Sequence, residues 1–208
     1  MKMSRFLRNA PLLAAVMVLL SQGGAQAGGF ANVNILSTPS PGSYSPNPAT
    51  PPGLGAGVSW TNTTVATHTA TGDAPLSYFD TGFLSPTQSA QVTFPVAGSY
   101  PYHCSIHSEM HGTVNLPMVA APSTGTAGVT QFGISWASSI PVGYNVDIQF
   151  RRNGGAWRTL FANRTGSQTE ALGMVANPGT YDVRARIQRS STGAASGYSP
   201  PVTIVVTA

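Results

Sequence analysis

The chain has 208 residues, of which only 8% are charged, while 23 are glycine and 17 are proline. Its net charge is +4, but three of the positive charges (Lys2, Arg5 and Arg8) lie in the first 27 residues, so the remainder carries only +1. A charge this small and this dispersed argues against a nucleic-acid-binding protein, and the glycine and proline content is typical of short strands joined by turns rather than of helices.

The first 27 residues predict an export signal. A positively charged start is followed by the apolar run "PLLAAVMVLL" at residues 11–20 and by the small-residue stretch "AQA" at residues 25–27. The apolar run is too short to span a bilayer. We therefore expect residues 1–27 to be a signal peptide, and the protein to be periplasmic or secreted without stable membrane insertion.

Strand patterns follow in the next part of the chain. The sequence "VSWTN" at residues 58–62 predicts a strand that leads into a loop. Further on, Tyr100, Tyr102 and Cys104 share a parity, as expected for one face of a strand. His103 has the opposite parity, so we expect it to point away from Cys104 and to lie at the surface.

The segment "CSIHSEMHG" carries metal-ligand chemistry. Cys104, the only cysteine, lies three residues before His107, and Met110 follows three residues later. Thiolate, imidazole and thioether suit copper above all. Zinc has little use for methionine, and an iron–sulfur cluster needs several thiolates. His68 is the candidate for the missing nitrogen donor, whereas His111 is expected to face solvent.

Residues 55 to 116 resemble a small cupredoxin of the plastocyanin and amicyanin type. The matching pieces are "VSWTN", "HTAT", "FDTGFLSP", "TFPVAGSYPYHC" and "CSIHSEMHGTV". The resemblance implies a cupredoxin Greek-key β-sandwich over residues 28–118. It also implies one type 1 copper ion, with His68, Cys104 and His107 as the trigonal plane and Met110 as the long axial contact.

The resemblance further implies a one-electron carrier that cycles between Cu(I) and Cu(II) and docks an unidentified redox protein. His107 would lie at the exposed edge of the site, with Ile106, Pro52 and Leu54 as its apolar surroundings. One departure is Thr69, which stands where many family members have an asparagine that hydrogen-bonds to the cysteine's loop. A hydroxyl can make a shorter version of that bond.

Catalysis fits this ligand set poorly, because four protein ligands leave no open position for a substrate, so we expect no enzyme activity. Two alternatives stay open. One is a copper storage or delivery protein in which His103 and His111 act as transient ligands. The other is an adhesion protein in which copper only stiffens the fold.

The second half of the chain predicts another all-β domain over residues 126–208, joined through a linker at residues 119–125. Strands are indicated at residues 146–150 and 179–189, and "NGG" at residues 153–155 indicates a hairpin turn. The segment resembles a fibronectin type III domain, with Trp136 as the core tryptophan and Tyr181 as the tyrosine corner.

Charge divides the two halves. Residues 28–118 contain three acidic residues and no lysine or arginine, whereas all seven remaining arginines lie after residue 118. We expect the arginines of "YDVRARIQR" to form a solvated strand face. One alternative is that they bind an anionic polymer or protein. Another is that Arg184 or Arg186 contacts the acidic first domain.

Overall fold

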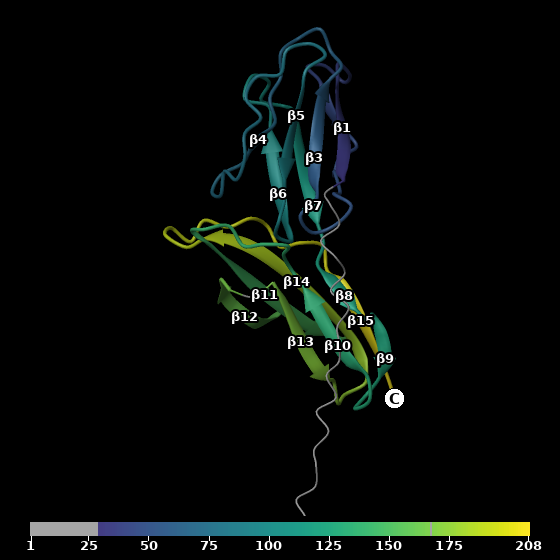
Figure 1. Ribbon diagram of the computed structural model, residues 1–208. Coiled ribbons are helices and arrows are strands. Elements are labelled where there is room, and N and C mark those ends of the chain that lie inside the picture. Colours follow the sequence, from purple (N-terminus) through teal and green to yellow (C-terminus); the bar gives the residue numbers. More distant parts are fainter. Residues whose placement is uncertain (1–28, 167) are drawn as a thin grey trace, which may run out of the picture.

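The computed structural model describes residues 29–166 and 168–208, so the expected signal peptide lies outside the described residues. The described part of the chain is all-β: it forms strands and turns and contains no helix. The described residues therefore include no helix long and apolar enough to cross a membrane. Four sheets build two β-sandwiches, and Figure 1 shows the first sandwich above the second.

The first sandwich pairs a four-stranded sheet with a three-stranded one. The first sheet has the order β2-β1-β3-β5, built from β1 (Phe30–Leu36), β2 (Ser43–Ser45), β3 (Gly57–Asn62) and β5 (Ser89–Thr93). The second has the order β4-β6-β7, built from β4 (Thr71–Gly72), β6 (Gly98–His103) and β7 (His111–Leu116). Strands β1 and β3 are parallel, whereas the other pairs of these two sheets are antiparallel.

An aromatic cluster fills the space between these sheets. The indole of Trp60 on β3 stacks on Phe79 at 5.2 Å and meets the ring of Tyr102 edge-on at 5.5 Å. Both Trp60 and Tyr102 are fully buried, and burial of such a ring contributes about 1.5–3 kcal/mol. The alternation predicted for residues 100–104, which form the end of β6 and the residue after it, is confirmed. Tyr100, Tyr102 and Cys104 are buried, while His103 is half-exposed on the opposite face.

The second sandwich pairs a three-stranded sheet with a five-stranded one. The smaller sheet has the order β13-β10-β8, built from β8 (Val119–Ala121), β10 (Gln131–Ser135) and β13 (Thr169–Met174). The larger has the order β12-β11-β14-β15-β9, built from β9 (Thr124–Thr126), β11 (Tyr144–Arg152), β12 (Arg158–Arg164), β14 (Gly179–Arg189) and β15 (Val202–Thr207).

The strands predicted in this half are present. Val183, Ala185 and Ile187 of β14 point into the core. The predicted hairpin turn joins β11 to β12, and Asn153 and Gly154 have positive φ angles of 50° and 71°. Both residue types tolerate that left-handed conformation, which the tight turn closed by the Gly155 N–H on the Arg152 carbonyl at 3.0 Å requires.

The segment expected as a linker, residues 119–125, is not free of strands. Strand β8 at its start pairs with β10, and strand β9 begins at Thr124 and pairs with β15. The second sandwich therefore takes up most of this segment. Strands β8 and β9 have three residues each, which is too few to show an alternating pattern in sequence, and their pairing partners lie elsewhere in the chain.

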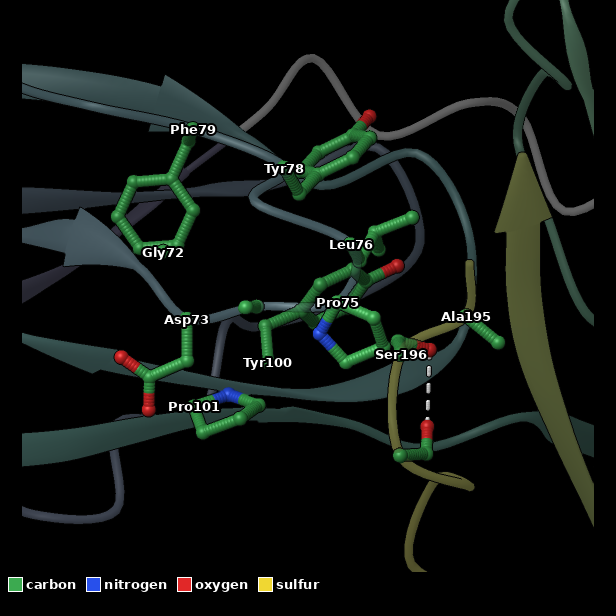
Figure 2. Close-up of a pocket in the computed structure, with 12 residues that line it drawn as sticks. Gly72, Asp73, Pro75, Leu76, Tyr78, Phe79, Tyr100, Pro101, Ala195 and Ser196 are labelled. Atoms are coloured by element: carbon green, nitrogen blue, oxygen red, sulfur yellow. Dashed lines mark hydrogen bonds between the residues drawn. The ribbon is translucent and has the colours of Figure 1, made fainter. Parts of the chain in front are cut away.

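Short backbone contacts join the two sandwiches. Ser99 and Gly197 exchange two hydrogen bonds of 3.0 and 2.9 Å, and Ala97 N–H donates to the Trp136 carbonyl at 2.7 Å. Beside them lies a hollow of about 120 Å³ (Figure 2), lined by residues 72–76, 78–79 and 100–101 of the first sandwich and 195–197 of the second. The strand that carries Ser99 therefore starts at the junction.

The arginines of the second sandwich mostly contact side chains of the same sandwich. Arg184 lies over the rings of Trp157 and Tyr198 at 3.9 and 4.3 Å, and Arg186 pairs with Asp147 at 3.0 Å. Among the described residues, the partners of Arg184 and Arg186 lie in the second sandwich and not in the first. Arg189 contacts the first sandwich instead, by donating to the Leu76 carbonyl at 3.3 Å.

Candidate metal centre

Three potential ligand atoms converge at one end of the first sandwich. The Cys104 Sγ lies 3.8 Å from His68 Nδ1 and 3.6 Å from His107 Nδ1, and all three atoms lie within 4.8 Å of one another. His68 and Cys104 are each 1% exposed, whereas His107 is half-buried. One sulfur and two imidazole nitrogens therefore face a common point from which only the His107 side is open to solvent.

His68 reaches this point from the loop after β3. Its backbone pairs with Leu84 through two hydrogen bonds of 3.1 and 2.8 Å, which fix the loop. Its Nε2 lies 3.1 Å from the Thr64 hydroxyl, so Nδ1 is the nitrogen left to face Cys104. Burial, and then the neighbouring His107, lower the pKa of His68. A lowered pKa favours the neutral imidazole, which is the form that binds a metal.

Cys104 and Met110 close the loop between β6 and β7. The Cys104 N–H donates to the Met110 carbonyl, and the Met110 N–H donates to the His107 carbonyl, both at 3.0 Å. The Thr69 N–H lies 3.4 Å from the Cys104 Sγ and donates toward it. A hydrogen bond to sulfur stabilises the thiolate, which is the ligand form of cysteine.

Thr69 connects the histidine loop to the cysteine loop. The Ser105 N–H donates to the Thr69 hydroxyl at 2.8 Å, and the two hydroxyls lie 3.1 Å apart. The Thr69 hydroxyl therefore makes a hydrogen bond to the loop that carries Cys104. Tyr44 adds a further tie, because its phenol donates to the Thr69 carbonyl.

Met110 is buried beside the glycine of an earlier loop. Its side chain is 1% exposed, and a Cβ built on Gly42 would approach the Met110 Sδ to 2.8 Å. The φ angle of Gly42 is +145°, a conformation that favours glycine. Gly42 therefore makes the space in which the thioether lies.

The other histidines and the expected apolar surroundings lie elsewhere. His103 and His111 are on the outer face of the sheet, as expected for both. Ile106 is 47% exposed next to His107. The loop of Pro52 and Leu54, which was expected beside His107 as well, lies elsewhere. A Cβ on Gly55 in that loop would lie 2.6 Å from the Ser138 hydroxyl, so this loop borders the second sandwich.

Sequence reasoning missed the residues that position the donors, namely Gly42, Tyr44, Thr64 and Ser105. Only Thr64 left a signal, because it lies four residues before His68. The other three gain their roles from contacts between distant segments, which no local pattern marks.

No protein-family model matches the chain. No curated protein matches it either.

Solved structures similar to parts of the chain include a purple cupredoxin from Nitrosopumilus maritimus, at 24% identity and a TM-score of 0.38, covering 41% of this chain and 98% of that one. A variant of amicyanin in its reduced Cu(I) form at pH 4 has 27% identity and a TM-score of 0.36, with 42% and 82% covered. A cytokine receptor complex has 14% identity and a TM-score of 0.33, with 68% and 87% covered.

Proposed function

We propose that this chain is a copper protein that carries single electrons, with His68, Cys104, His107 and Met110 as the ligands of one ion. The observation that carries the proposal is the approach of one sulfur and two Nδ1 atoms to within 4.8 Å of one another in a buried site. This donor set fits copper, because imidazole, thiolate and thioether together suit copper better than zinc. Bound copper supplies one-electron chemistry by changing between Cu(I) and Cu(II).

The protein's own residues supply rigidity and access. Thr64 holds the ring of His68, Thr69 ties the two ligand loops together, and the backbone bonds of Met110 keep the loop closed. Ligands held in this way need to move little when the charge at the site changes, which favours fast electron transfer. His107 is the one half-exposed donor, so the electron is proposed to pass through its ring to a redox protein.

The remaining features are proposed as follows. The closed donor set favours a carrier over an enzyme. The expected signal peptide would place the protein in the periplasm or outside the cell.

A fibronectin type III-like second sandwich is supported by the fully buried Trp136 and by the Tyr181 hydroxyl, which donates to the Asn177 carbonyl at 2.9 Å. Its arginine-bearing face is a candidate contact for an anionic polymer or protein.

The test is copper loading followed by spectroscopy. Wild-type protein with one equivalent of Cu(II) should show an intense thiolate-to-copper absorption and a narrow copper hyperfine splitting. Cys104→Ser should abolish the absorption, and His68→Ala should change both spectra, whereas Ser108→Ala in the same loop serves as the matched control. A spectrum that does not respond to His68→Ala would remove this residue from the site.

Voltammetry separates the carrier from its alternatives. A carrier should show a reversible one-electron wave and should keep its copper through repeated cycles. Loss of the ion to a chelator on reduction would favour copper delivery. Unchanged binding to a surface polymer after copper removal would favour an adhesion protein.

A further inference from the structure

The outer face of the β4-β6-β7 sheet carries a pair of histidines outside the donor set. His103 ends β6, His111 begins β7, and the two are direct cross-strand partners. The next pair along, Cys104 and Met110, is joined by a backbone hydrogen bond, so His103 and His111 form a non-hydrogen-bonded pair. In such a pair the Cα atoms are only about 4.5 Å apart and the side chains are close. The two imidazole centroids lie 6.4 Å apart.

A carboxylate fixes the first of these rings. The His103 Nδ1 lies 2.5 Å from the Asp73 Oδ1, and the two side chains are 36% and 29% exposed. Asp73 is itself held, because its N–H donates to the Pro101 carbonyl at 2.9 Å. A histidine whose Nδ1 is bound to a carboxylate presents its Nε2 as a metal ligand, and the carboxylate fixes the orientation of the ring.

The second ring is exposed to solvent, whereas its backbone is fixed. The Asn47 side chain donates to the His111 carbonyl at 3.1 Å and accepts from the Thr113 N–H at 3.1 Å. The side chain of His111 is exposed, so it can turn toward His103 by an ordinary rotamer change.

The pair is separate from the buried donors. Cys104 and Met110 point into the sandwich, whereas His103 and His111 point out of it, because successive residues of a strand face opposite sides. A metal ion bound to the outer rings would therefore need other ligands from water, which leaves it exchangeable.

We propose that His103 and His111 form a second metal site, open to solvent, that takes Cu(II) or Zn(II), with Asp73 as a positioning residue for His103. Two imidazoles and water suit both ions, and copper should bind more tightly than zinc. The site does not depend on the proposed electron-transfer function, since none of its residues belongs to the buried donor set.

Stepwise metal titration tests the site in protein purified without a polyhistidine tag. Cu(II) should bind in two equivalents, and only one of them should produce the thiolate absorption. The other equivalent should give a wide hyperfine splitting with nitrogen couplings. His103→Ala and His111→Ala should each abolish this equivalent and leave the thiolate absorption unchanged. Thr113→Ala, on the same face of β7, should abolish neither and is the matched control.

Asp73 and Cys104 give independent readouts. Asp73→Asn should weaken binding of Zn(II), measured by calorimetry, by about 10- to 100-fold without changing the thermal unfolding midpoint of the metal-free protein. Cys104→Ser should remove the thiolate absorption and retain the outer equivalent, which distinguishes failure of the buried site from failure of this one. A wild type that takes up one equivalent only would overturn the proposal. So would a second equivalent that survives in the His103→Ala/His111→Ala double variant.

Discussion

Small hydroxyl side chains hold the ligands of the candidate metal centre in place. The Thr64 hydroxyl forms a hydrogen bond with the Nε2 of His68. The Thr69 hydroxyl accepts a hydrogen bond from the N–H of Ser105, the residue directly after Cys104. Neither threonine is itself a candidate ligand. The positions of the donors therefore depend on hydrogen bonds that leave the donor atoms themselves free to bind a metal.

We expect Thr69→Val to destabilise the protein by about 1–3 kcal/mol, because it leaves the Ser105 N–H without its partner in a partly buried loop. Thr69→Ser keeps the hydroxyl and is the control. Urea unfolding measures the free energy, and equal losses in both variants would show that the hydrogen bond is unimportant.

We expect Gly42→Ala to displace Met110. The added Cβ would meet the Met110 Sδ at 2.8 Å and the Leu36 carbonyl at 2.9 Å, and the φ angle of +145° is strained for alanine. Overpacking of this kind costs roughly 1–3 kcal/mol. The resonance of the Met110 methyl group should shift, whereas Gly53→Ala, which meets nothing within 4 Å, should leave it in place.

At the scale of the element, a single strand places side chains on both faces of its sheet. Alternation in β6 sends Tyr100 and Tyr102 into the core and His103 to the surface, and Cys104 continues the inward parity just beyond the strand end. Strand β14 repeats the arrangement in the second sandwich, with Val183 and Ala185 inside and charged residues outside. The outward residues of β14 are not merely solvated, because they bind partners on neighbouring strands.

Asp182 on β14 gives a pH prediction. The Thr203 hydroxyl and Arg151 lower the pKa of Asp182 in the folded state. The unfolded chain then binds more protons in acid, so this stabilisation is present above the unfolded pKa of about 3.9 and is lost as pH falls through the folded pKa.

The free energy of unfolding of the wild type should therefore fall between pH 5 and pH 2 by more than that of Asp182→Asn, and urea titrations at several pH values would measure it. Parallel pH profiles of the two proteins would contradict the assignment. Glu170→Gln, at a more exposed ion pair, is the comparison.

At the scale of the whole molecule, the candidate metal centre and the junction lie at opposite ends of the first sandwich. Strand β6 starts at the junction beside Gly197 and ends at the ligand loop, and its six residues span about 20 Å. Within residues 29–166 and 168–208, the second sandwich thus lies away from the ligand end, and Figure 1 shows β6 running between the two ends. A redox partner would meet the ligand end without displacing the second sandwich.

We expect Arg189→Ala to loosen the junction without changing the metal centre. It removes the bond to the Leu76 carbonyl and the contact with the Tyr144 ring, whose centroid is 5.1 Å from the guanidinium carbon. Small-angle scattering should show a broader distribution of sizes, while the copper spectrum stays the same. Arg158→Ala on the exposed side of β12 is the control, and identical scattering from both variants would contradict a role for Arg189.

Sequence prediction succeeded where a residue's role depends on its near neighbours. The inward parity of Tyr100 and Tyr102, the hairpin turn at Asn153 and the spacing of Cys104, His107 and Met110 are local patterns. Strand β8 and the first two residues of β9 fall in the segment expected as a linker, residues 119–125, and no local pattern marks them because their pairing with β10 and β15 depends on distant segments.

The sequence alone determined the all-β class and the kinds of donor available, because alternation and ligand chemistry are properties of single residues and their spacing. The tertiary structure decided which atoms meet. His68 comes within 3.8 Å of Cys104 across 36 positions of chain, Gly42 makes room for Met110, and Asp73 reaches His103. Such contacts follow from how strands from separate segments pack on a common core, which local sequence does not encode.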